Sequence, residues 1–143
     1  MGLNSDAHNV FRNVNRELST EDIRMMNPIS LAFIGDAVYE LFVRTKIANG
    51  KLNSNKLHRN CSKIVRASAQ SKFLEHIYEY LTDEEKSVIR RGRNAQSHTV
   101  PKNANLSDYR NATALESLFG YLYLLGRDNR LKDLISKLII EDY

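Results

Sequence analysis

The stretch PISLAFIGDAVYELFVRTKIAN, residues 28–49, decides the fold class, because its apolar residues recur at helical spacing. One predicted inward stripe holds Ile34, Ala37, Val38, Leu41 and Phe42. Pro28 suits the first turn of a helix, and Gly50 suits the position just after its end. The pattern predicts a long helix from about Pro28 to Asn49.

Helical patterns continue on the C-terminal side. A helix is expected to start at Asn53, with Leu57, Cys61, Ile64, Val65 and Ala69 facing the core, and a separate one to cover 73–81. Thr82 and Glu85 form a capping-box pattern for a helix to about Arg91. Residues 92–108 are expected to form the one long connection. A second strong helix over about 107–126 turns Leu115, Leu118, Phe119 and Leu122 inward, and a last one covers 130–141. No segment has a strand pattern, so the predicted fold class is all-α.

Length and composition indicate a single soluble domain. The chain has 143 residues, 42% hydrophobic and 27% charged, with only six Gly and two Pro. Residues 1–22 are polar and are expected to form an arm or a short helix, with the domain proper over 23–143. The lone cysteine, Cys61, excludes an internal disulfide framework, and no membrane segment or signal peptide is visible. We therefore expect a cytoplasmic protein.

Two isolated acids are the first chemical signal. Asp36 is the only charged residue from Asn27 to Tyr39, and Glu116 is the only one between Arg110 and Arg127. An unpaired charge among packed apolar residues is costly, so each acid needs a reason to be there. A structural acid in a salt bridge is one such reason and remains an alternative for either residue alone.

Small residues beside both acids indicate that the two helices approach closely. Gly35 precedes Asp36, and Gly120 lies one turn after Glu116. A glycine inside a helix costs roughly 1 kcal/mol relative to alanine, so it usually serves close packing or access. Two acids brought together would repel unless a proton or a cation joined them, and Mg²⁺ suits oxygen ligands. The pair is therefore predicted to hold Mg²⁺.

A basic stretch is the second signal. Residues 86–107 contain no acid but carry Lys86, Arg90, Arg91, Arg93 and Lys102, with Asn94 and Asn103 among them. A second basic set, on the helix after Asn53, holds Lys56, His58, Arg59, Lys63 and Arg66. With a net charge of +4, both sets are candidate phosphate contacts, although a solvated surface is the plainer interpretation of any charge run.

These motifs resemble the ribonuclease III catalytic domain. Residues 31–39, LAFIGDAVY, are similar to its signature helix, and residues 113–124, TALESLFGYLYL, to its second acidic helix. Residues 56–72 resemble its middle helix. RGRNA at 91–95 and PKNA at 101–104 look like the Mini-ribonuclease III subgroup. The resemblance covers about residues 23–140.

The resemblance implies a homodimeric, metal-dependent endoribonuclease that cuts double-stranded RNA and leaves 5′-phosphate and 3′-hydroxyl ends. Asp36 and Glu116 would be its catalytic metal ligands, and maturation of the large-subunit (23S) ribosomal RNA precursor its role. The expected RNA contacts are Arg91, Arg93, Asn94, Lys102, Asn103, His58, Arg59 and Arg66. Gly35, Gly120, Glu40 and Thr113 would support the site, and no separate double-stranded-RNA-binding domain is expected.

The chain departs from the larger relatives at the site. Where they carry further acids, this chain has Ile29, Ala32 and Thr113, so the number of metal ions stays open. Glu40 could compensate in part or pair with a surface cation. Two rival functions also stay open: a non-catalytic RNA-binding relative in a ribonucleoprotein, and a helical dimerisation module. Cleavage of structured RNA with and without Mg²⁺ separates all three.

Overall fold

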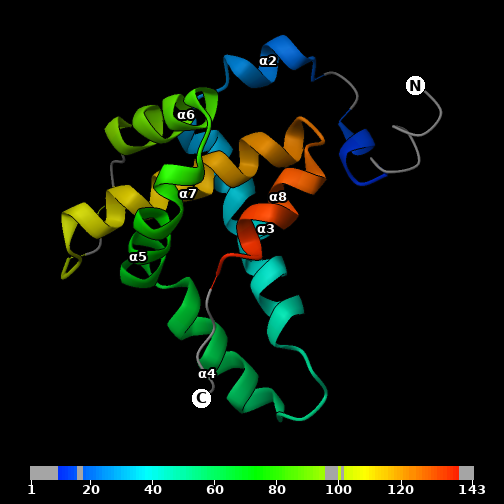
Figure 1. Ribbon diagram of the computed structural model, residues 1–143, viewed down its shortest axis with the longest axis vertical. Coiled ribbons are helices and arrows are strands. Elements are labelled where there is room, and N and C mark those ends of the chain that lie inside the picture. Colours follow the sequence, from blue (N-terminus) through cyan, green and yellow to red (C-terminus); the bar gives the residue numbers. More distant parts are fainter. Residues whose placement is uncertain (1–9, 16–17, 96–99, 101, 139–143) are drawn as a thin grey trace.

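The computed structural model describes residues 10–15, 18–95, 100 and 102–138, and all regular structure in these ranges is helical (Figure 1). The prediction of an all-α fold is confirmed. Two short 3-10 helices and seven α-helices are present in the described ranges: η1 Arg12–Val14, α2 Thr20–Arg24, α3 Pro28–Ile47, α4 Ser54–Val65, α5 Ala67–Ile77, η2 Tyr78–Tyr80, α6 Asp83–Asn94, α7 Leu106–Leu124 and α8 Asp128–Ile135.

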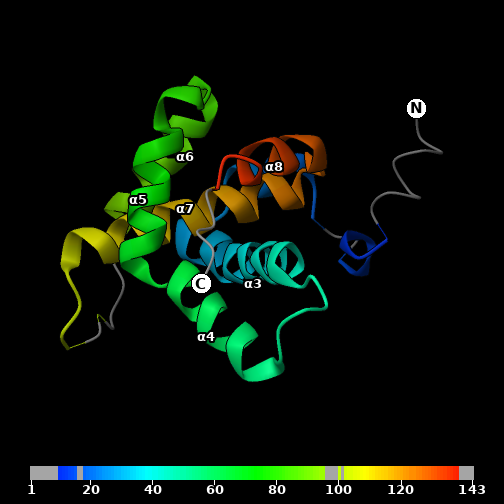
Figure 2. The ribbon, with the colours of Figure 1, turned by 60° about the horizontal axis from the view of Figure 1, so that its bottom comes forward.

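Helix α7 is the centre of the packing. Helices α3, α5 and α6 all pack against it, and α8 turns back beside its end (Figures 1 and 2). The side chains predicted to face inward are fully buried: Leu115, Leu118, Phe119 and Leu122. Helix α4 packs on the second half of α3 and extends away from the central group (Figure 1).

The predicted inward stripe of α3 is wrong in part. Ala37 and Leu41 are exposed, whereas Leu31, Tyr39 and Val43 are buried. The helix is rotated about its axis relative to the predicted orientation, because its glycine face, and not its widest apolar face, lies against α7. The apolar residues left outside this contact form an exposed row on α3.

The middle helical region breaks earlier than predicted. Arg66 is extended, with φ −64° and ψ 155°, so α4 ends at Val65 and α5 begins at Ala67. The predicted helix start holds, since the side chain of Asn53 accepts a hydrogen bond from the backbone N–H of Lys56. The segment 56–72 is therefore two helices joined at Arg66.

Helix α6 continues beyond its predicted end at Arg91. Its start is the predicted capping box of Thr82 and Glu85, but it runs to Asn94. Gly92 lies inside it, because a side chain there would press on the backbone of Ala114 in α7. Because α6 extends to Asn94, the connection before α7 is shorter than predicted. The last helix, predicted over about 130–141, is also shorter: α8 ends at Ile135, and residues 136–138 are not helical. Residues 139–141 lie outside the described residues.

Ion pairs hold the outer helices to this core. Buried Glu85 of α6 accepts two hydrogen bonds from Arg130 of α8, at 2.8 and 2.7 Å. Arg12 of η1 reaches Asp128 at 2.7 Å and lies over the ring of Tyr123.

The division of the chain at residue 22 stays a prediction. Within the described ranges, none of the helices combines the length and apolar character that crossing a membrane requires.

Candidate active site

The site is built on a contact between two helix backbones. A Cβ atom on Gly35 of α3 would overlap the carbonyl oxygen of Glu116, and one on Gly120 of α7 would overlap the carbonyl oxygen of Leu31. No side chain separates the helices at this crossing. Asp36 and Glu116, which adjoin it from either side, are therefore brought together.

Glu116 is partly buried and Asp36 is exposed. Burial is the largest cause that raises the pKa of Glu116 to about 8, and the nearby charge of Asp36 and a hydrogen bond between the two carboxyls act in the same direction. Without a cation, Glu116 is therefore largely protonated at neutral pH. A cation between the acids would favour their ionised forms.

A buried amide contacts Glu116 from α5. The Nε2 group of Gln70 donates to the Val65 carbonyl at 2.8 Å and to Glu116 Oε2 at 3.4 Å, and this second hydrogen bond acts to lower the Glu116 pKa. Gln70 Oε1 is buried and has no hydrogen-bond partner among the described residues. Tyr39 Oη is in the same situation, and burial together with the charge of Glu116 raises the Tyr39 pKa.

The neighbouring residue on α5 links the site to the basic stretch. Asn111 of α7 donates to Ser71 Oγ at 2.8 Å and accepts from the Arg93 guanidinium at 2.8 Å. Adjacent residues on α5 therefore bond to two residues of α7: Gln70 donates to Glu116, and Ser71 accepts from Asn111, which in turn accepts from Arg93. Helix α7 carries both of their partners.

These groups fit a hydrated divalent ion. Among the described residues, no set of three or more carboxylates, histidines or cysteines could hold a metal, so two carboxylates are what the site offers. Mg²⁺ is commonly bound through one or two carboxylates while it keeps several waters. The unpaired buried oxygens of Gln70 and Tyr39 are suitable partners for such waters.

The structure places the other predicted site residues as follows. Glu40 pairs with Arg44 at 2.7 Å, which is the surface role considered above, and Thr113 is buried and accepts a hydrogen bond from Ser117 through its carbonyl. Arg91 is half-buried near the end of α6. The remaining predicted RNA contacts are exposed: Arg93 and Asn94 on α6, Lys102 and Asn103 on the connection, His58 and Arg59 on α4, and Arg66 at the helix break.

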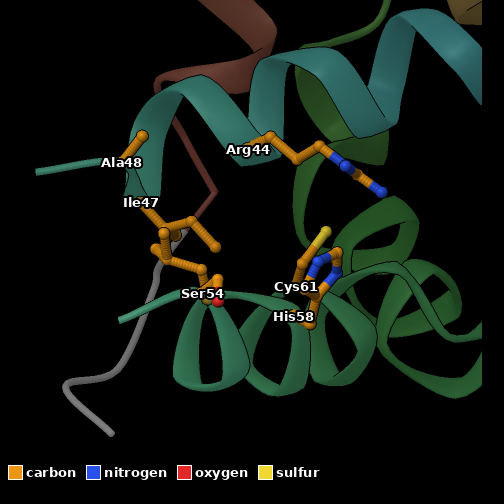
Figure 3. A pocket seen from close by; sticks show the side chains of 7 residues that line it. Arg44, Ile47, Ala48, Ser54, His58 and Cys61 are labelled. Carbon is orange, nitrogen blue, oxygen red and sulfur yellow. The ribbon is translucent and has the colours of Figure 1, made fainter. Parts of the chain in front are cut away.

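His58 lines a groove between α3 and α4 that is separate from the acids. The groove has a volume of about 190 Å³, and Arg44, Ile47 and Ala48 face Ser54, His58 and Cys61 across it (Figure 3). Burial raises the pKa of the Cys61 thiol, and so does the charge of Glu40. Cys61 is therefore a neutral, buried residue, as its position on the apolar stripe predicted.

Analysis of the sequence missed Gln70, Ser71 and Asn111. Gln70 shares a helix face with Phe73, Leu74 and Ile77, all buried. It is a lone polar residue in an apolar stripe, which is the same signal that identified the two acids. Asn111 and Ser71 had no such signal, because each follows another polar residue in the sequence, Arg110 and Gln70 respectively.

The raised pKa of Glu116 predicts how the stability of the metal-free protein depends on pH. The folded state keeps a proton up to about pH 8, whereas an unfolded glutamate loses it near 4.5. The free energy of unfolding should therefore fall as pH rises from about 4.5 to 8, because only the folded state still binds this proton. The scale of the effect is about 1.4 kcal/mol for each unit of pKa difference. Urea unfolding in a chelator at pH 5.5 and 8 should show a decline that Glu116→Gln reduces and that the surface change Glu75→Gln leaves intact. An identical decline in all three proteins would contradict the assignment.

Comparison with known proteins identifies the family. Residues 29–127 match the Ribonuclease III domain. Mini-ribonuclease 3 of Clostridium tetani is 49% identical over 129 residues, covering 89% of this chain and 85% of that protein. The corresponding Staphylococcus aureus protein is 44% identical, covering 82% and 90%. A crystal structure of a Fusobacterium nucleatum protein superposes with a TM-score of 0.72 at 32% identity, covering 80% of this chain and 93% of that one. The chain therefore belongs to the ribonuclease III family, in its Mini-ribonuclease 3 group, and is an endoribonuclease.

Proposed function

We propose that the protein hydrolyses double-stranded RNA with Mg²⁺ held by Asp36 and Glu116. The observation that carries this is the glycine crossing, which brings two acids together from two apolar helices. When bound, the ion supplies a nucleophilic water and neutralises charge on the scissile phosphate. Hydrolysis would leave a 5′-phosphate and a 3′-hydroxyl.

The protein's own groups hold and orient the reacting parts. Glu116 would hold the ion as a carboxylate, so the proton that its raised pKa favours in the metal-free protein would be lost to solvent when the ion binds. Asp36 is exposed, so RNA can reach its carboxylate from solvent. Cations near the site bind phosphates, and duplex RNA is recognised by its shape and backbone.

The test is cleavage of a duplex RNA and of each of its single strands, with Mg²⁺ and with a chelator. Cutting of the duplex in Mg²⁺ alone is expected. Cutting that persists in the chelator would overturn the metal assignment, and preferential cutting of single strands would overturn the substrate. The non-catalytic alternative has no support, because a scaffold has no use for two acids held together at a cost. Family resemblance further favours a large-subunit ribosomal RNA precursor in the cytoplasm as the substrate.

The basic residues of α6 and the following connection supply RNA affinity in this proposal. Replacing Arg91, Arg93 and Lys102 with glutamine should weaken binding similarly across duplex sequences. The plot of log affinity against log salt should flatten by roughly 0.7–0.9 for each phosphate that is no longer bound. Neutralising Lys132 and Lys137, in and after α8, is the control and should leave the slope nearly unchanged. A triple variant with the original slope would place the RNA elsewhere.

We further propose that two copies pair through the exposed row on α3. Phe33 and Leu41 are 80% and 61% exposed, and Ala37 between them is also exposed. The three are spaced four residues apart, so they form one apolar row on a helix that also carries Asp36. Closed two-fold pairing is the commonest way to cover such a surface. Tyr39 and Phe42, two other aromatic residues of α3, contact Phe119 in the core and are not part of this row.

Light scattering at micromolar concentration should therefore give the mass of a dimer. Phe33→Asp with Leu41→Asp should give a monomer with reduced cleavage, because pairing would then bury unpaired carboxylates in place of apolar side chains. Leu106→Asp, at an exposed apolar residue on another helix, should remain dimeric. An unmodified protein that is monomeric and fully active would end the proposal.

A further inference from the structure

Gln70 is a buried amide in a position that suits an apolar residue. It is 3% exposed, and the next residues on its helix face are Phe73, Leu74 and Ile77. Leaving a buried polar atom unpaired lowers stability, and Oε1 of Gln70 has no partner among the described residues. Leucine or methionine would pack there without that cost. The amide therefore has a role besides packing.

The break between α4 and α5 determines which way this amide points. Arg66 is extended, and the Val65 carbonyl at the end of α4 accepts a hydrogen bond from Gln70 Nε2 at 2.8 Å. Glu116 Oε2, at 3.4 Å, is a second acceptor for the same NH₂ group. Because both neighbours are acceptors, the donor end of the amide lies toward Glu116, and Oε1 is turned away from both.

The hydrogen bond bears on how Glu116 can bind an ion. A glutamate side chain has several rotatable bonds, and only some of its orientations direct an oxygen to the same point as Asp36. A hydrogen bond to Oε2 restricts those orientations and leaves Oε1 of Glu116 available. Partners of this kind, one step removed from the metal, typically change metal affinity or activity by 10–100-fold.

We propose that Gln70 is a positioning residue of the active site, which orients the Glu116 carboxylate for the metal ion through the Val65–Gln70–Glu116 hydrogen bonds. Its Oε1 has no hydrogen-bond partner among the described residues, so only the NH₂ end of the amide acts on the site. This inference rests on the proposed function of Glu116. It adds a third residue, from a third helix, to the two acids.

The test is Gln70→Met, which keeps the length of the side chain and removes both polar atoms. Calorimetric titration of the RNA-free protein should show Mg²⁺ affinity reduced by 10–100-fold. The melting temperature of the metal-free protein should be unchanged or higher, because an unpaired buried atom is gone. Duplex RNA binding in a chelator should be unchanged, and excess Mg²⁺ should restore part of kcat.

Ser71→Ala is the matched control, because Ser71 is the next residue on α5 and is similarly buried but bonds to Asn111. Its Mg²⁺ affinity should equal that of the unmodified protein. If Gln70→Met does not fold, Gln70→Asn replaces it. That amide is one methylene too short to reach both Val65 and Glu116, so the same loss is expected.

The outcomes distinguish a failure of the Gln70 inference from a failure of the proposed function of Glu116, on which it rests. Mg²⁺ affinity within twofold of the unmodified value in a folded Gln70 variant would overturn the positioning role, whatever its melting temperature. Glu116→Gln is titrated alongside. If it also binds Mg²⁺ normally and cleaves RNA, the proposed function itself is wrong. If only Glu116→Gln loses the metal, the site is right and the role of Gln70 is wrong.

Discussion

Asp36→Asn and Glu116→Gln should each lower cleavage by at least about 10²–10³-fold, the scale of losing one charge-stabilising group in an active site. The metal-free protein should stay as stable as before, or become more stable, in both variants. Each change keeps the size of the side chain and removes one of two carboxylates that oppose each other. Binding of duplex RNA should largely survive, because it depends on the cations.

A structural role predicts the opposite pattern. Were either acid the partner of a buried cation, its neutral variant would strand that cation and lose about 3–5 kcal/mol of stability. The described partner of Glu116 on α5 is the neutral amide of Gln70, which argues against this. Melts and cleavage assays on the same samples distinguish the two patterns, with the exposed change Glu75→Gln as a control. Loss of folding with a proportionate loss of activity would make these acids structural.

The second large effect is expected at the helix crossing. Gly35→Ala places a methyl group on the backbone of α7, which cannot turn aside as a side chain could. Overpacking costs typically about 1–3 kcal/mol, and a clash with backbone should reach the upper end of that range. Relief requires α3 and α7 to separate, which also separates Asp36 from Glu116. A displacement of about 1 Å at an active site can cost 10²-fold in rate.

Gly50→Ala provides the comparison. Gly50 has a φ of 77° and open space around it, so alanine there should cost about 1–2 kcal/mol through backbone strain alone. Cleavage per folded molecule should remain normal in Gly50→Ala and fall steeply in Gly35→Ala. Gly120→Ala, which meets the Leu31 carbonyl from the other helix, should behave like Gly35→Ala. A stable and active Gly35→Ala would show that the helices are not in contact there.

Most residues of the candidate site could be predicted from the sequence, because they are unusual for the helices that contain them. Asp36 and Glu116 stand alone in apolar helices, and Gly35 and Gly120 interrupt good helical sequence. Each is a local anomaly that needs no knowledge of tertiary contacts. The buried face of α7 was predictable for a related reason, since a helix packed on several sides is apolar almost all round.

What could not be predicted depended on packing between distant segments. The rotation of α3 followed from its glycine contact with α7, which outweighed the apolar stripe that includes Ala37 and Leu41. No glycine or proline stands beside Arg66, so the sequence gives no sign of its extended conformation. The extension of α6 past Gly92 depends on space opposite Ala114. Periodicity within one helix carries no information about the shape of the surface it meets.

The paired hydrogen bonds of α5 bear on where an RNA strand is cut. Ser71 and Gln70 are adjacent, and their partners Asn111 and Glu116 are five residues apart on one helix. Arg93, bonded to Asn111, therefore stands at a set distance from the acids. With a phosphate bound at Arg93, the number of nucleotides between that phosphate and the cleaved bond becomes a constant of the fold. Variation in cleavage position among substrates would then arise from irregularities in the RNA helix.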